Sequence, residues 1–308
     1  MRIIQNIQKF INDPKIRMGY LSCLGFYKNW SDEKYVKKSF MIRMGYDLDL
    51  GNPKTFNEKI QWLKLSDHNP LYTQMVDKYE AKEFVANVLG DEYIIPTLGV
   101  WNKFENIDFS KLPNQFVLKC THDSGGLAIC KDKRTFNTEN AKKEIKKSLK
   151  RNFYWIGREW PYKNVKPRII AEAYMEQEDG SGLIDYKFFC FNGVPQLLYV
   201  SRGLDHHPTA QIGFYDMNGN EMPFHRSDYK PYHGATMPHN FDEMKVIAQK
   251  LAEKVGCPFV RIDLYSINGK IYFSEITFSP CSGMIPFEPV SADEELGKLI
   301  KLPIEGQI

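Results

Sequence analysis

The sequence predicts an α+β fold, in which α-helices are combined with antiparallel β-hairpins. Two Asn-Gly dipeptides, Asn192-Gly193 and Asn268-Gly269, each separate two runs rich in β-branched and aromatic residues, which is the strongest short hairpin signal. Between these hairpins, residues 244–255 carry apolar side chains at helical spacing, and Gly256 supplies the stop. The 308 residues are 43% hydrophobic, enough for a substantial core in two domains or one elaborate one.

Charge and cysteine content narrow the classes of function. The 41 basic and 38 acidic residues leave a formal net charge of only +3, which argues against a protein that coats nucleic acid. The six cysteines include no Cys-x-x-Cys pair and favour a reducing compartment. No apolar run approaches the roughly 20 residues that cross a bilayer, and the N-terminus lacks the apolar block of a signal peptide. We therefore expect a cytoplasmic protein without a nucleic-acid partner.

Residues 1–45 differ from the rest of the chain in their charge. Residues 1–11 carry apolar side chains at helical spacing, and basic residues outnumber acidic ones as far as Arg43. One interpretation is a peripheral contact with anionic lipid, or with a lipid-linked substrate, at the inner face of the membrane. The other is an ordinary surface helix packed on the body of the protein.

Two more helices precede the first hairpin. Thr55 and Glu58 have the spacing of a capping box, so we expect a helix to begin there. Residues 77–89 predict another helix, and residues 92–101 predict a loop that leads into a short strand.

A glycine-containing loop, residues 121–126, joins two strand-like runs at residues 116–118 and 127–131. Gly125 and Gly126 permit positive φ, and successive N–H groups in such a turn can form an anion nest beside Lys119. The alternative is a glycine hairpin that binds nothing.

Lys187 is unusual because it lies inside the apolar run of residues 185–191, after a strand at 168–175 and a polar stretch at 176–182. A lysine in such a strand either meets an anion or points outward from an edge strand.

Two carboxylates are expected to meet near the second Asn-Gly turn. Arg261 and Asp263 share one face of the strand at residues 257–265, and the return strand at 271–277 brings Glu275 close to Asp263. Two neighbouring carboxylates need a cation, and all-oxygen ligands suit Mg²⁺, which would leave Arg261 for a phosphate. The alternative is a partly solvated cluster of charges.

Six short motifs, which contain seven candidate site residues, resemble in this order those of the ATP-grasp superfamily. They are Lys78 in V-D-K-Y-E-A-K, Lys119 before H-D-S-G-G, Glu172 in I-I-A-E-A-Y-M, Lys187 in D-Y-K-F-F-C-F-N-G, Arg261 and Asp263 in V-R-I-D-L-Y, and Glu275 in F-S-E-I-T. More narrowly, N-P-K-T-F-N-E-K-I-Q-W-L-K-L and D-Y-K-F-F-C-F-N-G are similar to sequences of the TupA-like ATP-grasp proteins, named for teichuronopeptide biosynthesis. The resemblance covers residues 32–290.

The resemblance implies an ATP-grasp fold in which two α+β subdomains clasp ATP, with ATP and Mg²⁺ as cofactors. The implied divisions are a helical N-terminal region (1–75), a first subdomain with a glycine-rich lid (76–170) and a second subdomain with the hinge and the metal strands (171–308). The N-terminal region departs from the family, since it reads as helices instead of a Rossmann-like domain.

The resemblance also implies roles for individual residues. The implied nucleotide contacts are Lys78, Lys119, the lid residues His122, Asp123, Ser124, Gly125 and Gly126, and the hinge residues Glu172, Ala173, Tyr174 and Met175. The implied catalytic residues are Lys187 and Arg261, and the implied magnesium ligands are Asp263, Glu275 and Thr277. Thr277 stands where the family usually has Asn, so its hydroxyl or a water would be the third oxygen.

The implied function is an ATP-dependent carboxylate–amine ligase that acts through an acyl-phosphate. Its partners would be an amine and a sugar acid of bacterial surface polysaccharide, such as capsule or a teichuronopeptide-like polymer. The absence of G-x-S-x-G and H-E-x-x-H motifs agrees with chemistry that needs no protein nucleophile. The alternatives are a sugar-modifying kinase or glycosyltransferase, and a non-catalytic nucleotide-binding scaffold. Residues 279–284 are either a loop that binds the acceptor or carboxylate, or an ordinary turn.

Overall fold

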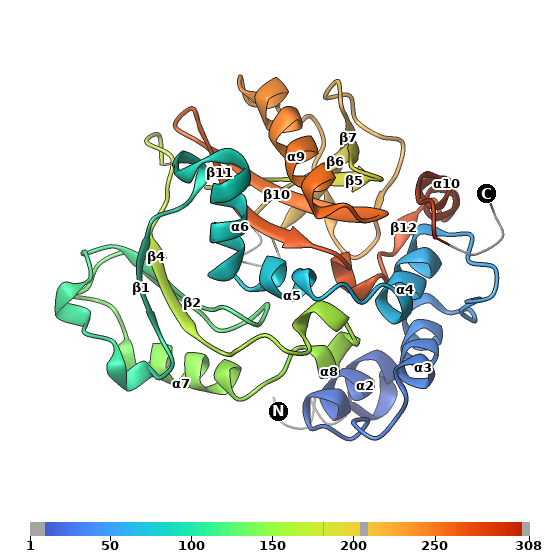
Figure 1. Cartoon of the computed structure of the whole chain (residues 1–308), viewed down its shortest axis with the longest axis horizontal. Coiled ribbons are helices and arrows are strands. Elements are labelled where there is room, and N and C mark those ends of the chain that lie inside the picture. Colours follow the sequence, from blue (N-terminus) through green and yellow to red (C-terminus); the bar gives the residue numbers. More distant parts are fainter. Residues whose placement is uncertain (1–9, 181, 204–208, 304–308) are drawn as a thin grey trace.

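The computed structural model describes residues 10–180, 182–203 and 209–303, and their fold contains two main β-sheets with helices around them (Figure 1). The mixture of helices and antiparallel strands predicted from the sequence is confirmed. Within these ranges every helix is too short or too polar to traverse a membrane. Most of the predicted amphipathic segment at 1–11 lies outside the described residues.

The N-terminal region is helical, as expected. Its helices are α2 (Pro14–Cys23), α3 (Asp32–Met44), α4 (Phe56–Ser66) and α5 (Leu71–Val76). The predicted capping box is present, because Thr55 Oγ1 accepts from the Glu58 N–H and the Glu58 carboxylate accepts from the Thr55 N–H. Tyr35 and Phe40 of α3 pack with Met18 of α2 in a separate small core.

The four-stranded sheet is antiparallel and carries one long helix. Its strands, in spatial order, are β1 (Thr97–Trp101), β4 (Ile169–Ala173), β2 (Phe116–Cys120) and β3 (Leu127–Cys130). In β2, Phe116 and Leu118 pack in the core with Ile145 of α7 (Thr138–Leu149). Strand alternation therefore places Lys119 on the opposite face, which is turned away from α7.

The six-stranded sheet contains both Asn-Gly hairpins. Its order is β11 (Lys270–Thr277), β10 (Phe259–Ile267), β5 (Ile184–Phe191), β6 (Val194–Arg202), β7 (Gln211–Asp216) and β9 (Lys230–Pro231), of which only the β7–β9 pair is parallel. Asn268 and Gly269 have φ values of 50° and 80°, the two positive values that a type I′ turn requires. The turn fixes the register of β10 and β11.

Different helices cover the two faces of the six-stranded sheet. On one face, Val260 and Ile262 pack with α9 (Phe241–Val255), which ends at Gly256 as predicted. On the other face, Phe189 and Phe259 pack with Phe56 of α4 and with α10 (Ser291–Leu299). Side chains that share the second face with these phenylalanines are therefore close to the N-terminal helices.

Helix α6 (Glu80–Leu89) connects the two sheets (Figure 1). Its Val85 belongs to the core of the six-stranded sheet, while its Lys82 forms an ion pair with Glu172 of the four-stranded sheet. The helix was expected to begin at Asp77. It begins later because Asp77 Oδ1 accepts from the N–H groups of Tyr79 and Glu80, as a capping carboxylate does.

Short elements complete the fold. They are η1 (Asp91–Tyr93), η2 (Phe104–Asn106), η3 (Phe109–Lys111), α8 (Tyr154–Gly157), η4 (Trp160–Tyr162), η5 (Pro280–Ser282) and the pair β8 (His225–Arg226) and β12 (Phe287–Glu288). The division of the chain after residues 75 and 170 stays a prediction; the second boundary falls inside β4, which pairs wholly within the four-stranded sheet.

Candidate active site

A row of polar side chains crosses the six-stranded sheet at one level. Tyr199 on β6 pairs with Lys187 on β5. Lys187 in turn pairs with Asp263 on β10, which pairs with Glu275 on β11. Paired residues in a sheet project to the same face, so four strands contribute to one row. The expected approach of Asp263 to Glu275 is therefore met by direct cross-strand pairing.

Arg261 lies between the two carboxylates of this row. Its Nε donates to Asp263 Oδ1 at 2.7 Å, and its Nη2 donates to Asp263 Oδ2 at 2.6 Å. The same Nη2 donates to Glu275 Oε1 at 2.7 Å and to Thr277 Oγ1 at 3.0 Å. From the other side, Lys187 Nζ donates to Asp263 Oδ2 at 2.6 Å. The carboxylate pair thus shares a cation, which relieves its mutual repulsion.

Burial and charge act differently on the two carboxylates. Asp263 is fully buried, which raises its pKa, while Arg261 and Lys187 oppose the rise. Burial also disfavours the ionised form of Glu275, but Arg261, Lys187 and Lys78 outweigh it and lower the pKa of Glu275 to about 2. Glu275 is therefore a carboxylate at neutral pH, and its side chain is 40% exposed.

Lys78, Lys119 and Lys82 form a second cationic group beside the row. Lys119 Nζ lies 2.7 Å from Glu172 Oε2, and Lys82 Nζ lies 2.5 Å from Glu172 Oε1. Burial raises the pKa of Glu172, but the two lysines reverse the shift and lower it. Burial lowers the pKa of Lys78, and Glu275 and Glu172 counteract this from the two sheets. Lys78 therefore lies within electrostatic range of the polar row and of Glu172 on the four-stranded sheet.

The predicted lid loop is held against α7 by its own side chains. Asp123 Oδ2 accepts from Ser148 Oγ at 2.7 Å and pairs with Arg151 Nη2 at 2.5 Å. His122 Nε2 lies 3.2 Å from Ser148 O, and Lys78 Nζ donates to Asp123 O at 2.7 Å. His122 and Asp123 thus anchor the loop, while Ser124 is exposed at its tip. Phosphate contacts by this loop stay a prediction.

Gly126→Ala should lower the free energy of unfolding by about 2 kcal/mol or more, because Gly126 combines positive φ with no room for a side chain. Its φ is 63°, and an added Cβ would lie 2.5 Å from Ser148 Cβ and 2.7 Å from Cys120 Sγ. Gly125→Ala is the matched control, since its Cβ would approach only the flexible end of Arg151 within 3 Å. Urea unfolding of both variants measures the difference, and equal losses would contradict this account of the loop.

The chain matches the model of the TupA-like ATP-grasp family over residues 58–301. The match includes most of α4, both sheets and every residue of the polar row. The chain belongs to the TupA-like ATP-grasp family. Its fold is accordingly the ATP-grasp fold, with the four-stranded and six-stranded sheets as the cores of two α+β subdomains.

Solved structures resemble this TupA-like chain only distantly. The D-alanine–D-alanine ligase from Bacillus anthracis, solved with ATP, is 11% identical over 86% of this chain and 81% of its own, with a TM-score of 0.41. The ATP-grasp ligase PsnB, solved with Mg and ADP, is 9% identical over 72% of this chain and 56% of its own, with a TM-score of 0.38. The D-cycloserine synthetase DcsG is 14% identical over 75% of this chain and 71% of its own, with a TM-score of 0.39. The chain thus spans little more than half of PsnB. Among curated proteins, none matches it significantly.

Asp263 and Glu275 fit a magnesium ion in their chemistry. The part of the chain that the structure describes brings together no three His, Cys, Asp or Glu side chains suited to a metal. Two carboxylates and the Thr277 hydroxyl, which donates to Glu275 Oε1 at 3.0 Å, nonetheless supply three oxygens. Such a set suits Mg²⁺ once the Arg261 guanidinium turns toward a phosphate. The three ligand assignments of this TupA-like protein stay predictions.

The predicted hinge of this family member begins at Glu172, which is 5% exposed. Ala173 N donates to Pro96 O at 3.0 Å, and Lys131 Nζ lies 5.8 Å above the Tyr174 ring. After it, Gln177 Nε2 donates to Ser266 O at 2.7 Å, so the segment crosses from one sheet to the other. Adenine binding by residues 172–175 stays a prediction.

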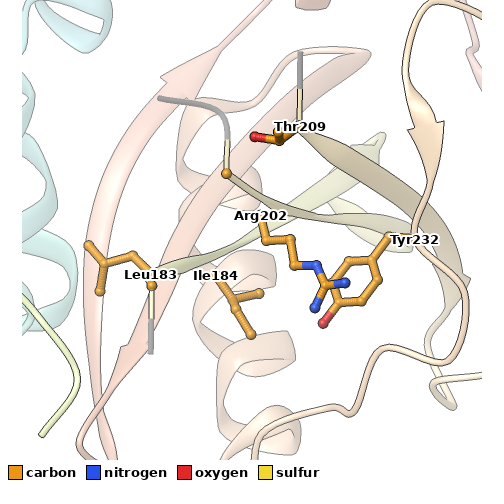
Figure 2. A pocket seen from close by; sticks show the side chains of 7 residues that line it. Leu183, Ile184, Arg202, Thr209 and Tyr232 are labelled. Carbon is orange, nitrogen blue, oxygen red and sulfur yellow. The ribbon is translucent and has the colours of Figure 1, made fainter. Parts of the chain in front are cut away.

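Figure 2 shows a hollow of about 340 Å³ whose lining includes none of the predicted site residues. It is lined by Gly182, Leu183, Ile184, Arg202, Gly203, Thr209 and Tyr232. The Arg202 guanidinium stacks on Tyr232 at 4.3 Å and donates to Gln211 Oε1 at 2.6 Å. The Arg202 guanidinium therefore already has partners in Tyr232 and Gln211. The rest of the lining is mainly apolar.

Several charged residues of the site were not predicted. Lys82 was missed, although the helix expected from Asp77 would have placed it on one face with Lys78, four residues earlier. Arg151 and Arg168 gave no signal, since each meets its carboxylate, Asp123 or Asp77, only in the folded chain. Glu159 also gave no signal in the sequence; it follows α8 in the chain and is 6% exposed.

Proposed function

We propose that this protein is an ATP-dependent ligase that joins a carboxylate to an amine through an acyl-phosphate. The observation that carries the proposal is the row of Lys187, Asp263 and Glu275, with Arg261 held between the two carboxylates. Phosphoryl transfer depends on positioning and on cations that stabilise developing charge, and needs no protein nucleophile. The row supplies such charges on rigid strands, and membership of the family supports ATP as the donor.

In this proposal, residues from both sheets contact the triphosphate of ATP. Lys78 and Lys119 would hold the triphosphate from the side of the four-stranded sheet, and Lys187 would contact it from the other. Mg²⁺ bound by Asp263 and Glu275 would neutralise charge on the phosphates. The substrate carboxylate attacks the terminal phosphorus in line, and Arg261 would turn from the carboxylates to the transferred group. Asp185 and Asp263 would keep Lys187 charged, since both carboxylates raise the pKa of Lys187 against burial.

For the substrates we propose a sugar acid of bacterial surface polysaccharide, such as capsule or a teichuronopeptide-like polymer, and an amine acceptor. This choice rests on the resemblance described above, since the TupA-like proteins are named for teichuronopeptide biosynthesis. A sugar kinase would use the same ATP site but leave phosphate on a hydroxyl. A glycosyltransferase would consume a nucleotide-sugar instead.

Hydroxylamine distinguishes these reactions. With Mg-ATP and glucuronate, the protein should convert hydroxylamine to a hydroxamate and release ADP and phosphate, because hydroxylamine captures acyl-phosphates and not phosphorylated hydroxyls. The ferric complex of the hydroxamate and released phosphate are measured together, over a panel of uronic acids. Transfer from a nucleotide-sugar while ATP stays intact would overturn the ligase proposal.

We also propose that the N-terminal region contacts anionic lipid. Ile16 and Tyr20 of α2 and Leu24 at its C-cap follow one another at four-residue spacing, and their exposed fractions are 44%, 57% and 67%. Such spacing places them on one face of the helix. Phe26 is 68% exposed and Lys28 is exposed nearby, so apolar and basic groups occur together. An apolar face with basic residues favours the interface of an anionic bilayer.

Replacing Tyr20, Leu24 and Phe26 together by Ser should remove binding to vesicles that contain phosphatidylglycerol, since it removes the groups that enter the bilayer. Cosedimentation measures the bound fraction, with phosphatidylcholine vesicles as the uncharged comparison. Val290→Ser is the matched control, because Val290 is 72% exposed outside this region. Equal binding by the triple variant and Val290→Ser would exclude this surface as the membrane contact.

A further inference from the structure

A buried carboxylate next to the polar row has no role in the function proposed above. Glu159 lies between α8 and η4, in the connection from α7 to β4, and is 6% exposed. The charged and titratable groups that face it are Lys64 of α4, Glu275 and Arg261 of the row, and Tyr162 of η4. Ser282 of η5 lies beside it. Glu159 is therefore at the contact of the N-terminal helices with the catalytic sheet.

The segment that carries Glu159 is held in one conformation. Arg158 has a φ of 54°, a left-handed conformation that costs a residue with a side chain roughly 1–3 kcal/mol. Its guanidinium lies 4.4 Å from the Trp155 ring and 4.8 Å from the Tyr35 ring, and Nη2 donates to Tyr27 O at 2.6 Å. Tyr35 Oη also donates to Ile156 O at 2.7 Å. The N-terminal helices thus fix the turn that buries Glu159.

Lys64 does not neutralise Glu159 by direct contact. Its Nζ donates to Gln61 Oε1 at 2.8 Å, to Ser282 O at 3.0 Å and to Ser282 Oγ at 3.2 Å, which uses its three protons. Among the residues that the structure describes, no ion pair joins Glu159 to this or another cation. A buried carboxylate is costly without a cation in contact, so the site is suited to a ligand that brings one.

The geometry points to Glu159 as the residue that receives the amine acceptor, binding its ammonium group and removing a proton before the nitrogen attacks the acyl carbon. The inference rests on the ligase function proposed above. Of the three ammonium protons, one passes to Glu159, one leaves with the phosphate and one stays on the amide nitrogen. The C–N bond forms as the bond from the acyl carbon to the phosphate oxygen breaks.

The acidity of Glu159 suits this role. Burial raises its pKa above that of an ordinary glutamate, although Lys64 and Ser282 oppose the rise. A general base is most effective when its pKa is near the working pH. Lys64 and Ser282 would act as positioning residues, because they hold η5 and the turn of Gly157 together: Ser282 Oγ donates to Gly157 O at 3.3 Å. The helical region thereby completes the acceptor side of the site.

The test compares two nucleophiles on the same acyl-phosphate. Wild type and Glu159→Gln are assayed with Mg-ATP and glucuronate, either with hydroxylamine or with ethanolamine, L-alanine and L-lysine. Hydroxylamine is largely neutral at neutral pH and needs no base to free its lone pair. The ratio of amide to hydroxamate should therefore fall about 100-fold or more in Glu159→Gln, the usual contribution of a general base. Glu294→Gln, an exposed carboxylate on α10, should leave the ratio unchanged.

Two outcomes would overturn the inference, and both differ from failure of the ligase proposal. An unchanged ratio in Glu159→Gln would show that Glu159 only supports the fold. The second readout needs no turnover: with Mg²⁺ and a non-hydrolysable ATP analogue, the three amines should raise the melting temperature of the wild type and not of Glu159→Gln. Equal shifts in both proteins, or none in either, would also refute it. Absence of hydroxamate from the wild type would refute the ligase proposal, while the melting shifts would still decide the role of Glu159.

Discussion

Glu275→Gln should reduce ATP-dependent hydroxamate formation by about a thousandfold or more, while lowering the free energy of unfolding by no more than about 1–2 kcal/mol. The loss of activity follows from removing one of two carboxylates proposed to hold Mg²⁺. The small loss of stability follows because Glu275 is 40% exposed and Arg261 keeps both hydrogen bonds to Asp263. Hydroxamate assays and urea unfolding of the purified variant measure the two effects. Activity within tenfold of the wild type would remove Glu275 from the metal site.

The stability difference between wild type and Glu275→Gln should depend on pH. The pKa of Glu275 is lowered from 4.5 to about 2 in the folded protein, against burial, by Arg261, Lys187 and Lys78. A carboxyl with a lowered pKa contributes stability above its unfolded pKa, and that contribution is lost as the pH falls toward the folded value. The two proteins should therefore differ at pH 7 and converge between about pH 4 and pH 2.

Asp263→Asn should abolish hydroxamate formation and also lower the free energy of unfolding by about 3–5 kcal/mol. Asp263 is fully buried and accepts from both Arg261 and Lys187, so its loss leaves two buried cations without their shared carboxylate. Asn has nearly the same volume, which limits the effect to charge. The midpoint of urea unfolding, compared with that of Glu275→Gln, measures the difference between losing a fully buried carboxylate and losing a partly exposed one.

A double variant separates structure from chemistry at Asp263. Lys187→Met removes one of the two cations that lose their shared carboxylate, so Asp263→Asn combined with Lys187→Met should regain part of the lost stability, as directly contacting residues are rarely additive. Hydroxamate formation should not return, because neither the carboxylate nor the lysine is restored. Additive losses of stability in the double variant would contradict the ion pair as the reason for the instability of Asp263→Asn.

The sequence was informative where local periodicity and turn chemistry set the structure. Asn268-Gly269 fixed the register of one hairpin, and alternation along the strand placed Arg261 and Asp263 on one face. Those two facts sufficed to bring Asp263 to Glu275. The capping box at Thr55 and the helix end at Gly256 were predictable for the same reason, since each depends on residues within one turn of the helix.

Local signals failed where partners come from distant segments. Glu159, Lys64 and Ser282 are separated by about a hundred residues each, and none stands in a pattern that predicts the others. Lys82 and Glu172 are likewise 90 residues apart, and α6 had to reach the four-stranded sheet before they could pair. The lid loop has contacts that its glycines did not indicate: Asp123 and His122 hold it to Ser148 of α7, while the anion nest stays a prediction.

By itself the sequence determined the α+β class, both Asn-Gly hairpins, the approach of the two carboxylates and the resemblance to the TupA-like ATP-grasp proteins. Only the tertiary structure decided which cation lies between Asp263 and Glu275, that Lys78 is within electrostatic range of carboxylates on both sheets, and that the N-terminal helices bury Glu159 beside the row. The physical reason is that these interactions act over different distances along the chain. Backbone preferences act within a few residues, whereas the energy of a buried charge depends on every group around it, from whatever part of the chain.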